Sequence, residues 1–310
     1  MKRRTLRALS AAAGLSAVLG AFGGTAATAA PAPVTTTTTT AATVVAAPAL
    51  RIGMSAPRSE WSTRVAEVGG IDARRIFGTL NDPDSALRLA ASEIAAGRMP
   101  ILSFRLPGDD WAGATAGTYD VALRALSARL DALPGKVFVT IHHEPASDGT
   151  PAAYAAMQRH VLPILSPPSN VDAGVVVNGW FWSAKARGLT DAEIAQWLPP
   201  SVLQLAEVVA ADAYQGGTQA RLGEDAGAKI RRMSAWADRV GVKRMGIGEY
   251  NGLDGAAIRS AGDAVLADPR FEFASVFNSS ENNREGVNWV LSGSRITEFR
   301  ATVATARARG

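Results

Sequence analysis

Short apolar runs alternate with longer amphipathic stretches from residue 50 to the end of the chain. The short runs are continuous and rich in Val, Ile and Ala, which is typical of parallel strands buried on both faces. We predict eight strands, at Leu50–Ser55, Ala73–Thr79, Met99–Arg105, Lys136–His142, Asp172–Asn178, Glu207–Ala213, Lys243–Glu249 and Phe271–Asn278. Because a helical stretch follows each run, the pattern indicates a parallel sheet with helical crossovers.

The longer stretches carry the signals that begin helices. Asn81 and Asp82 form a cap before Pro83, and Thr190 with Glu193 forms a capping box. We predict eight helices, at Ser59–Val68, Pro83–Ala96, Thr118–Ala132, Pro151–Ile164, Thr190–Trp197, Asp225–Val240, Asp254–Ala267 and Ser294–Arg307. Eight strands alternating with eight helices over residues 49–310 predict a single α/β domain, a (β/α)₈ TIM barrel.

A doubly wound open sheet is the competing fold. It predicts a glycine-rich turn after the first strand. The residues there are Gly53-Met54-Ser55-Ala56, which lack the glycine spacing of that turn. The barrel is therefore favoured.

The first 48 residues lie outside the alternating pattern. Lys2 and three arginines precede the apolar stretch Ala8–Gly24, and small residues suited to cleavage follow it. Residues 1–30 are therefore predicted to be a signal peptide, by the general or the twin-arginine route, which implies secretion. Residues 31–48 contain only Ala, Pro, Val and Thr and are predicted to be a linker. We expect a monomer with no membrane segment after signal removal, either released or held at the cell wall.

The net charge of +4 belongs to the predicted signal peptide. Without its four basic residues, the chain has equal numbers of basic and acidic side chains. A nucleic-acid-binding protein needs a basic surplus, so we expect no nucleic-acid partner. The absence of cysteine excludes disulfides, thiol chemistry and a lipoprotein anchor.

Polar residues gather at the carboxyl ends of the predicted strands, where barrels place their active sites. One strand runs into His142-His143-Glu144-Pro145, and Pro145 stops the strand because proline cannot donate to the ladder. About a hundred residues later, another strand ends in Glu249. Two strands that each deliver a glutamate predict a pair of carboxylates facing one another across a site.

Two opposed glutamates suit the cleavage of a glycosidic bond. One protonates the leaving oxygen, and the other attacks the anomeric carbon or activates water. Tryptophans nearby offer flat faces for sugar rings, and polar side chains offer contacts to hydroxyls. The residues that we expect to bind a polysaccharide substrate are His143, Tyr214, Arg105, Trp111, Trp180, Trp182, Asn278 and Trp289. Of Trp180 and Trp182, one must face inward.

Three motifs resemble those of clan A retaining glycoside hydrolases. They are His143–Pro145 after a strand, Asp212–Tyr214 on the sixth strand and Gly248–Tyr250 on the seventh. Within that clan, the sequence most resembles glycoside hydrolase family 26, in which histidine precedes the acid/base glutamate. The resemblance spans most of the barrel through short motifs.

The resemblance implies roles for individual residues. Glu144 would be the acid/base and Glu249 the nucleophile, and Tyr214 would donate a hydrogen bond to that nucleophile. His143 would orient the acid/base or contact the attacked sugar. The clan also implies retention through a covalent glycosyl-enzyme, with the carboxyl groups roughly 5 Å apart.

Two positions depart from the family pattern and bear on substrate. Asn278 stands where many relatives have a tryptophan at the tip of the eighth strand, and Trp289 comes eleven residues later. Pro145 replaces the residues that often follow the glutamate in mannanases. β-1,4-Mannan is the substrate that the resemblance implies, with β-1,3-xylan and mixed-linkage glucan as alternatives.

Histidine and aspartate also admit structural interpretations. His142 alternates with His143 and is predicted to be structural, and His160 lies within a helix as a surface or packed residue. Asp212 shares a face with Tyr214 and would hold it or an arginine. With three histidines, none on the first, fifth or sixth strand, we expect no metal and no cofactor.

Two other functions stay open. A non-catalytic barrel could use the aromatic groove to bind an envelope glycan or a protein, but such a protein has no need of two opposed acids. An inverting hydrolase would place the carboxyl groups well beyond the retaining distance.

Overall fold

The computed structural model describes residues 49–184 and 187–309. The predicted signal peptide and linker lie outside these described residues. No helix within the described ranges combines the length and the apolar character that crossing a membrane requires.

Eight parallel strands close into a barrel in the order β1-β10-β9-β6-β5-β4-β3-β2. Their bounds are β1 Arg51–Ser55, β2 Ala73–Thr79, β3 Met99–Arg105, β4 Val137–Ile141, β5 Val171–Asn178, β6 Val208–Tyr214, β9 Met245–Asn251 and β10 Phe271–Phe277. Each predicted strand corresponds to one of these, so the predicted (β/α)₈ barrel is confirmed.

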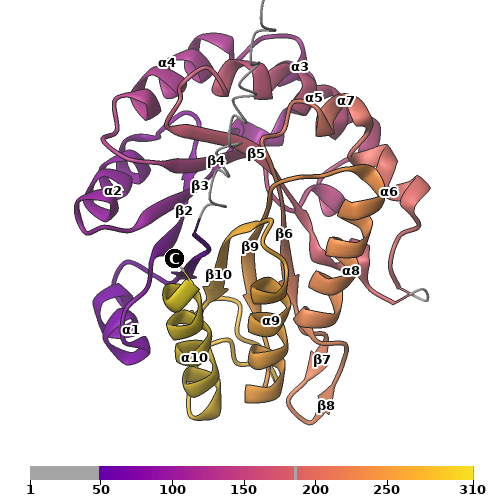
Figure 1. Cartoon of the computed structure of the whole chain (residues 1–310). Coiled ribbons are helices and arrows are strands. Elements are labelled where there is room, and N and C mark those ends of the chain that lie inside the picture. The colour runs from indigo at the N-terminus through magenta and orange to yellow at the C-terminus, as the bar shows by residue number, and fades with distance from the viewer. Residues whose placement is uncertain (1–48, 185–186, 310) are drawn as a thin grey trace, which may run out of the picture. The chain divides into compact units, whose positions relative to one another are not determined.

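The helices lie outside the strands (Figure 1). Their bounds are α1 Trp61–Val68, α2 Asp84–Ala95, α3 Trp111–Thr115, α4 Asp120–Asp131, α5 Pro151–Leu165, α6 Asp191–Trp197, α7 Pro200–Leu203, α8 Ala226–Val240, α9 Gly255–Ala267 and α10 Ser294–Arg309. The eight predicted helices are all present. The sequence pattern did not predict α3, α7 or the small hairpin of β7 (Gly217–Thr218) and β8 (Arg221–Leu222). All of these lie in connections between the main elements, where apolar periodicity is weak.

Alternate residues of the strands fill the barrel interior in layers. The lower layer is an apolar cluster of Ala73, Ile101, Phe138, Val176, Val208, Ala210 and Phe273. Two residues further along the same strands the inward positions become polar. They include Arg75, Ser103, Thr140 and Asp212, all buried. The core thus changes from apolar to polar toward the carboxyl ends, directly below the two predicted glutamates.

Candidate active site

Glu144 is held at the end of β4 by an unusual backbone. The strand ends at Ile141, one residue earlier than predicted, because His142 adopts a left-handed conformation with φ of 63°. Glu144 is also left-handed, with φ of 51°, and its N–H donates to Val176 O at 3.0 Å. Non-glycine residues rarely adopt such angles, and they tend to do so where function requires a side chain in a particular place.

Glu249 reaches the barrel mouth from within β9. The pairing of β6 with β9 shifts by one residue between Ala211 and Asp212, so that Asp212 lies opposite Glu249. Such a bulge changes the direction of the next side chain. Gly248 occupies the shift, where a Cβ atom would lie 2.4 Å from Asp212 Oδ1. The small residue before Glu249 is therefore a steric requirement of the site.

Tyr214 holds one oxygen of Glu249. The Tyr214 hydroxyl donates to Glu249 Oε2 at 2.7 Å, and the glutamate is 5% exposed. Burial raises the pKa of Glu249, while the charge of Arg75 and the hydrogen bonds from Tyr214 and Ser55 oppose that rise. Tyr214 stays protonated because burial, followed by the charge of Glu249, raises its pKa. These contacts favour the ionised form of Glu249.

Glu144 lies in an environment that favours its proton. Burial, followed by the charge of Glu249, raises the pKa of Glu144 to about 7. Arg75 and Arg105 oppose this rise but do not cancel it. The hydrogen bonds from Tyr214 and Ser55 oppose protonation of Glu249, whereas the charge of Glu249 favours protonation of Glu144. Such unequal surroundings of two carboxyl groups can divide acid and base roles.

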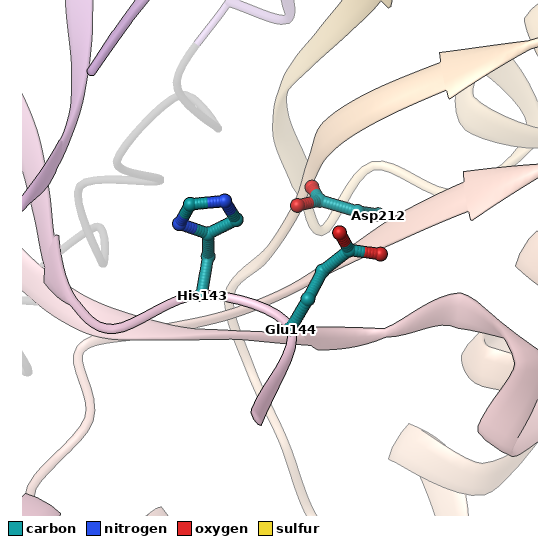
Figure 2. Close-up of side chains that lie close together, drawn as sticks. All are labelled: His143, Glu144 and Asp212. Atoms are coloured by element: carbon teal, nitrogen blue, oxygen red, sulfur yellow. The ribbon is translucent and has the colours of Figure 1, made fainter. Parts of the chain in front are cut away.

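A third carboxylate, Asp212, faces Glu144 (Figure 2). Ligand atoms of His143, Glu144 and Asp212 all lie within 4.8 Å of one another. Asp212 is 3% exposed, and burial raises its pKa, against the charge of Arg75. Arg75 Nη2 lies 3.8 Å from Asp212 Oδ2, and both side chains are fully buried. Asp212 thus holds an arginine, one of the two structural interpretations from the sequence.

The sequence analysis missed Arg75, although a signal was present. Arg74 and Arg75 are adjacent in a strand whose two faces are both covered, so one of them has to point into the barrel. Arg74 points outward to Glu93, with Nη1 at 2.8 Å from Oε1. Arg75 points inward and supplies the positive charge beneath three carboxylates.

His143 is a neutral residue beside Glu144. Burial, followed by the charges of Arg75 and Arg105, lowers the pKa of His143 to about 2. Its Nδ1 lies 2.8 Å from the hydroxyl oxygen of Ser103, which orients the ring. A neutral imidazole can exchange a hydrogen bond with a sugar hydroxyl, but it cannot supply a proton at ordinary pH.

By distance, His143, Glu144 and Asp212 could hold a divalent metal after small side-chain movements. Arg75 already gives Asp212 a positive partner, and Glu144 has the environment of a proton donor. We therefore assign no metal to this cluster.

Arg105 and Trp111 support the loop after β4. Trp111 Nε1 donates to His142 Nδ1 at 3.0 Å, and His142 Nε2 lies 2.8 Å from Asp148 Oδ2. Arg105 Nη1 also donates to that aspartate, at 2.6 Å, and stays half-buried at the rim. Trp111 is 5% exposed, so its ring is a packing surface for His142 and not a platform for sugar. The structural role predicted for His142 matches these contacts.

Three other predicted contacts are also buried. Trp182 packs against Trp236 with ring centroids 5.3 Å apart, so it faces the core instead of the mouth. Asn278 accepts a hydrogen bond from Leu291 N at 2.9 Å and is fully buried, which removes it from the substrate surface. Trp289 is 6% exposed and lies 5.2 Å from the Tyr214 ring, behind the nucleophile candidate. Loop position alone cannot distinguish these packed residues from exposed ones.

Trp180 remains available at the surface. It is the second residue of the short 3₁₀ helix Gly179–Trp182 that follows β5, and it is 41% exposed. Of the four tryptophans predicted to bind sugar, it is the one whose ring the structure leaves open to solvent.

Solved structures with similar architecture include several glycoside hydrolases. One is a modular endo-β-1,4-mannanase of glycoside hydrolase family 26 from Cellulomonas fimi. It matches with a TM-score of 0.57 and 17% identity, over 83% of this chain and 70% of the mannanase chain, so the two share a fold. An endoglucanase catalytic domain from Thermobifida fusca has a TM-score of 0.55 and 13% identity, covering 84% and 92%. A family 1 β-glucosidase from Thermotoga maritima has a TM-score of 0.54 and 10% identity, covering 81% and 86%.

No protein-family model and no curated protein matches the sequence. The shared fold with the family 26 mannanase confirms the resemblance that the motifs implied, at the level of the barrel fold.

Proposed function

We propose that the protein is a secreted glycoside hydrolase that cleaves a β-linked polysaccharide by a retaining mechanism. The observation that carries the proposal is the difference between its two glutamates. Burial raises the pKa of Glu144 to about 7, so it can carry a proton, whereas at Glu249 the charge of Arg75 and the Tyr214 hydroxyl oppose the rise in pKa that burial causes. A glycan-binding barrel has no use for this difference.

In the proposed first step, a Glu249 oxygen attacks the anomeric carbon while Glu144 donates its proton to the leaving glycosidic oxygen. The products are a covalent glycosyl-enzyme and the released alcohol. In the second step, Glu144, now ionised, takes a proton from water as that water attacks the anomeric carbon. The ester to Glu249 breaks, both carboxyl groups return to their starting states, and the configuration is retained.

β-1,4-Mannan is the substrate that we propose. Support comes from the histidine that precedes Glu144 and from the fold shared with the Cellulomonas fimi mannanase. β-1,3-Xylan and mixed-linkage glucan remain the alternatives.

The experiment that tests the function is reducing-sugar release from β-mannan, xylan and β-glucan by the mature protein. Release from one polymer identifies the sugar, and NMR of the first product gives the anomeric configuration. No release from any of the three would contradict the hydrolase proposal. An inverted product would exclude the covalent intermediate and favour the inverting alternative.

Tyr214→Phe should impair the nucleophile without removing it. Losing the hydrogen bond raises the pKa of Glu249 further, so the acidic limb of the kcat/KM profile should move to higher pH. We expect kcat to fall roughly tenfold, because the bond also orients the carboxylate. The measurement is kcat/KM between pH 4 and 9.

Tyr250→Phe is the matched control. Tyr250 is buried one residue after Glu249, and within the described part of the chain its hydroxyl has no hydrogen-bond partner. Its removal should leave the acidic limb in place. Equal shifts in both variants would argue that the effect comes from general packing.

Glu144→Gln should stabilise the fold at alkaline pH. The folded pKa of about 7 lies above the ordinary value of 4.5, so stability is fully present below pH 4.5 and decreases as pH rises through 7. Glutamine removes that loss, and the free energy of unfolding should rise by about 1–2 kcal/mol at pH 8 after allowance for partial solvent exposure. Urea unfolding at pH 4 and pH 8 measures the difference, which should nearly vanish at pH 4. Glu67→Gln, a substitution of a half-buried residue on α1, should show no such pH-dependent gain.

A further inference from the structure

Phe77 is an exposed aromatic residue on the catalytic side of the barrel. Among residues 49–184 and 187–309, the aromatic side chains left largely open to solvent are Phe77, at 46%, and Trp180, at 41%. A large apolar side chain exposed on an otherwise polar face commonly marks a contact surface. Trp180 was anticipated as a sugar contact, but Phe77 was not.

Strand geometry places the Phe77 side chain inside the barrel mouth. Alternate residues of β2 point inward, beginning with Ala73 in the apolar layer and continuing with buried Arg75. Phe77 is the next inward residue, so its ring lies above the Arg75 guanidinium. The distance from the Phe77 ring centroid to Arg75 Cζ is 5.1 Å. It therefore forms part of the wall that substrate meets.

The ring adjoins residues already assigned to the site. Phe77 pairs with Ser103 across the β2–β3 ladder, and Ser103 holds His143. The ring centroids of Phe77 and His143 are 5.2 Å apart. In the barrel order, β2 lies opposite β6, which carries Asp212 and Tyr214. A pyranose ring between the two sides would have polar groups on one face and Phe77 on the other.

The end of β10 offers no aromatic face to a sugar, because Phe277 is buried there. Asn278 stands there and is fully buried, and Trp289 packs behind Tyr214. Sugar rings present apolar C–H faces that pack well on aromatic rings. The contact is favourable because it removes apolar surface of both partners from water.

We propose that Phe77 is the stacking platform for the sugar ring bound beside His143. This inference rests on the proposed glycan hydrolysis. It assigns the stacking face to β2 and makes Phe77 a determinant of substrate affinity.

Three substitutions separate stacking from packing. Phe77→Ala removes the ring, Phe77→Leu keeps apolar cover over Arg75 without a flat face, and Phe77→Trp keeps a flat face. On the polymer that the parent degrades best, we expect KM to rise roughly tenfold in the Ala and Leu variants, with a smaller change in kcat. The Trp variant should keep a KM near that of the parent. Val121→Ala, on the exposed face of α4, is the surface control and should behave as the parent.

The outcomes distinguish this inference from the proposed function. Parental KM in both Phe77→Ala and Phe77→Leu, with active parent enzyme, would overturn the platform and leave the hydrolase intact. Restoration by leucine, or a shift of the pH profile, would assign Phe77 to positioning Arg75 and would also overturn it. If the parent hydrolyses nothing, calorimetric titration with soluble β-1,4-manno-oligosaccharides decides. Weaker binding by both Phe77→Ala and Phe77→Leu, with parental binding by Phe77→Trp, would support the platform without hydrolysis, and no binding by the parent would reject both.

Discussion

Glu249→Ala should reduce glycan hydrolysis by roughly 10⁴-fold or more, because the variant has no group to attack the anomeric carbon. The fold should survive the change. The substitution leaves the Tyr214 hydroxyl without its acceptor, but it also removes a buried carboxyl group whose ionisation is opposed by desolvation. The measurement is the initial rate of reducing-sugar release, with circular dichroism to confirm folding.

Added azide sharpens the test of Glu249. A small anion that fits the space left by the carboxylate should attack the anomeric carbon directly and give a glycosyl azide of inverted configuration. Glu67→Ala, which removes a half-buried glutamate on α1, is the control and should retain parental rates. Substantial hydrolysis by Glu249→Ala without azide would contradict the nucleophile assignment.

Glu144→Ala should lower hydrolysis of the polymer by about 10²–10⁴-fold, the range expected for loss of a general acid. The loss should be much smaller on aryl glycosides, whose leaving groups depart without protonation. This contrast between substrates separates an acid from a residue that merely shapes the site.

The pH profile provides the second readout for Glu144. The proposed mechanism requires a protonated Glu144 in the parent, so kcat/KM should decrease as pH rises through about 7. The acidic limb should reflect the ionisation of Glu249 and lie above the ordinary glutamate pKa. Because the two groups interact, the limbs belong to the pair as a whole. In Glu144→Ala the alkaline limb should disappear, and its persistence would assign the acid to another group.

The placement of the two glutamates was predictable because it depends on local signals. Apolar runs of strand length, separated by capped helices, predicted each barrel strand to within about two residues at its ends. Pro145 marked the end of β4, and the carboxyl ends of parallel strands meet on one face of a barrel. Glu144 and Glu249 could therefore be assigned to one site from the sequence.

The environment of these residues depended on barrel closure. Arg75 and Asp212 are 137 positions apart, and only the closed sheet brings their charges within 3.8 Å. The shift that aims Glu249 inward arises where β6 and β9 pair, and Gly248 is needed there for steric reasons. Both features involve contacts between distant strands, which a one-dimensional pattern does not encode.

The aromatic residues show the same difference between what the sequence predicts and what the tertiary structure decides. Their number and their loop positions were visible in the sequence, but exposure is decided by what packs against each ring. Trp182 is covered by Trp236, and Trp111 by His142 and its neighbours, whereas Phe77 is left open above Arg75. The sequence by itself determined the barrel and its glutamate pair, through periodicity and strand termination. Only the tertiary structure decided the charge beneath that pair and the aromatic face beside it, because both arise from long-range packing.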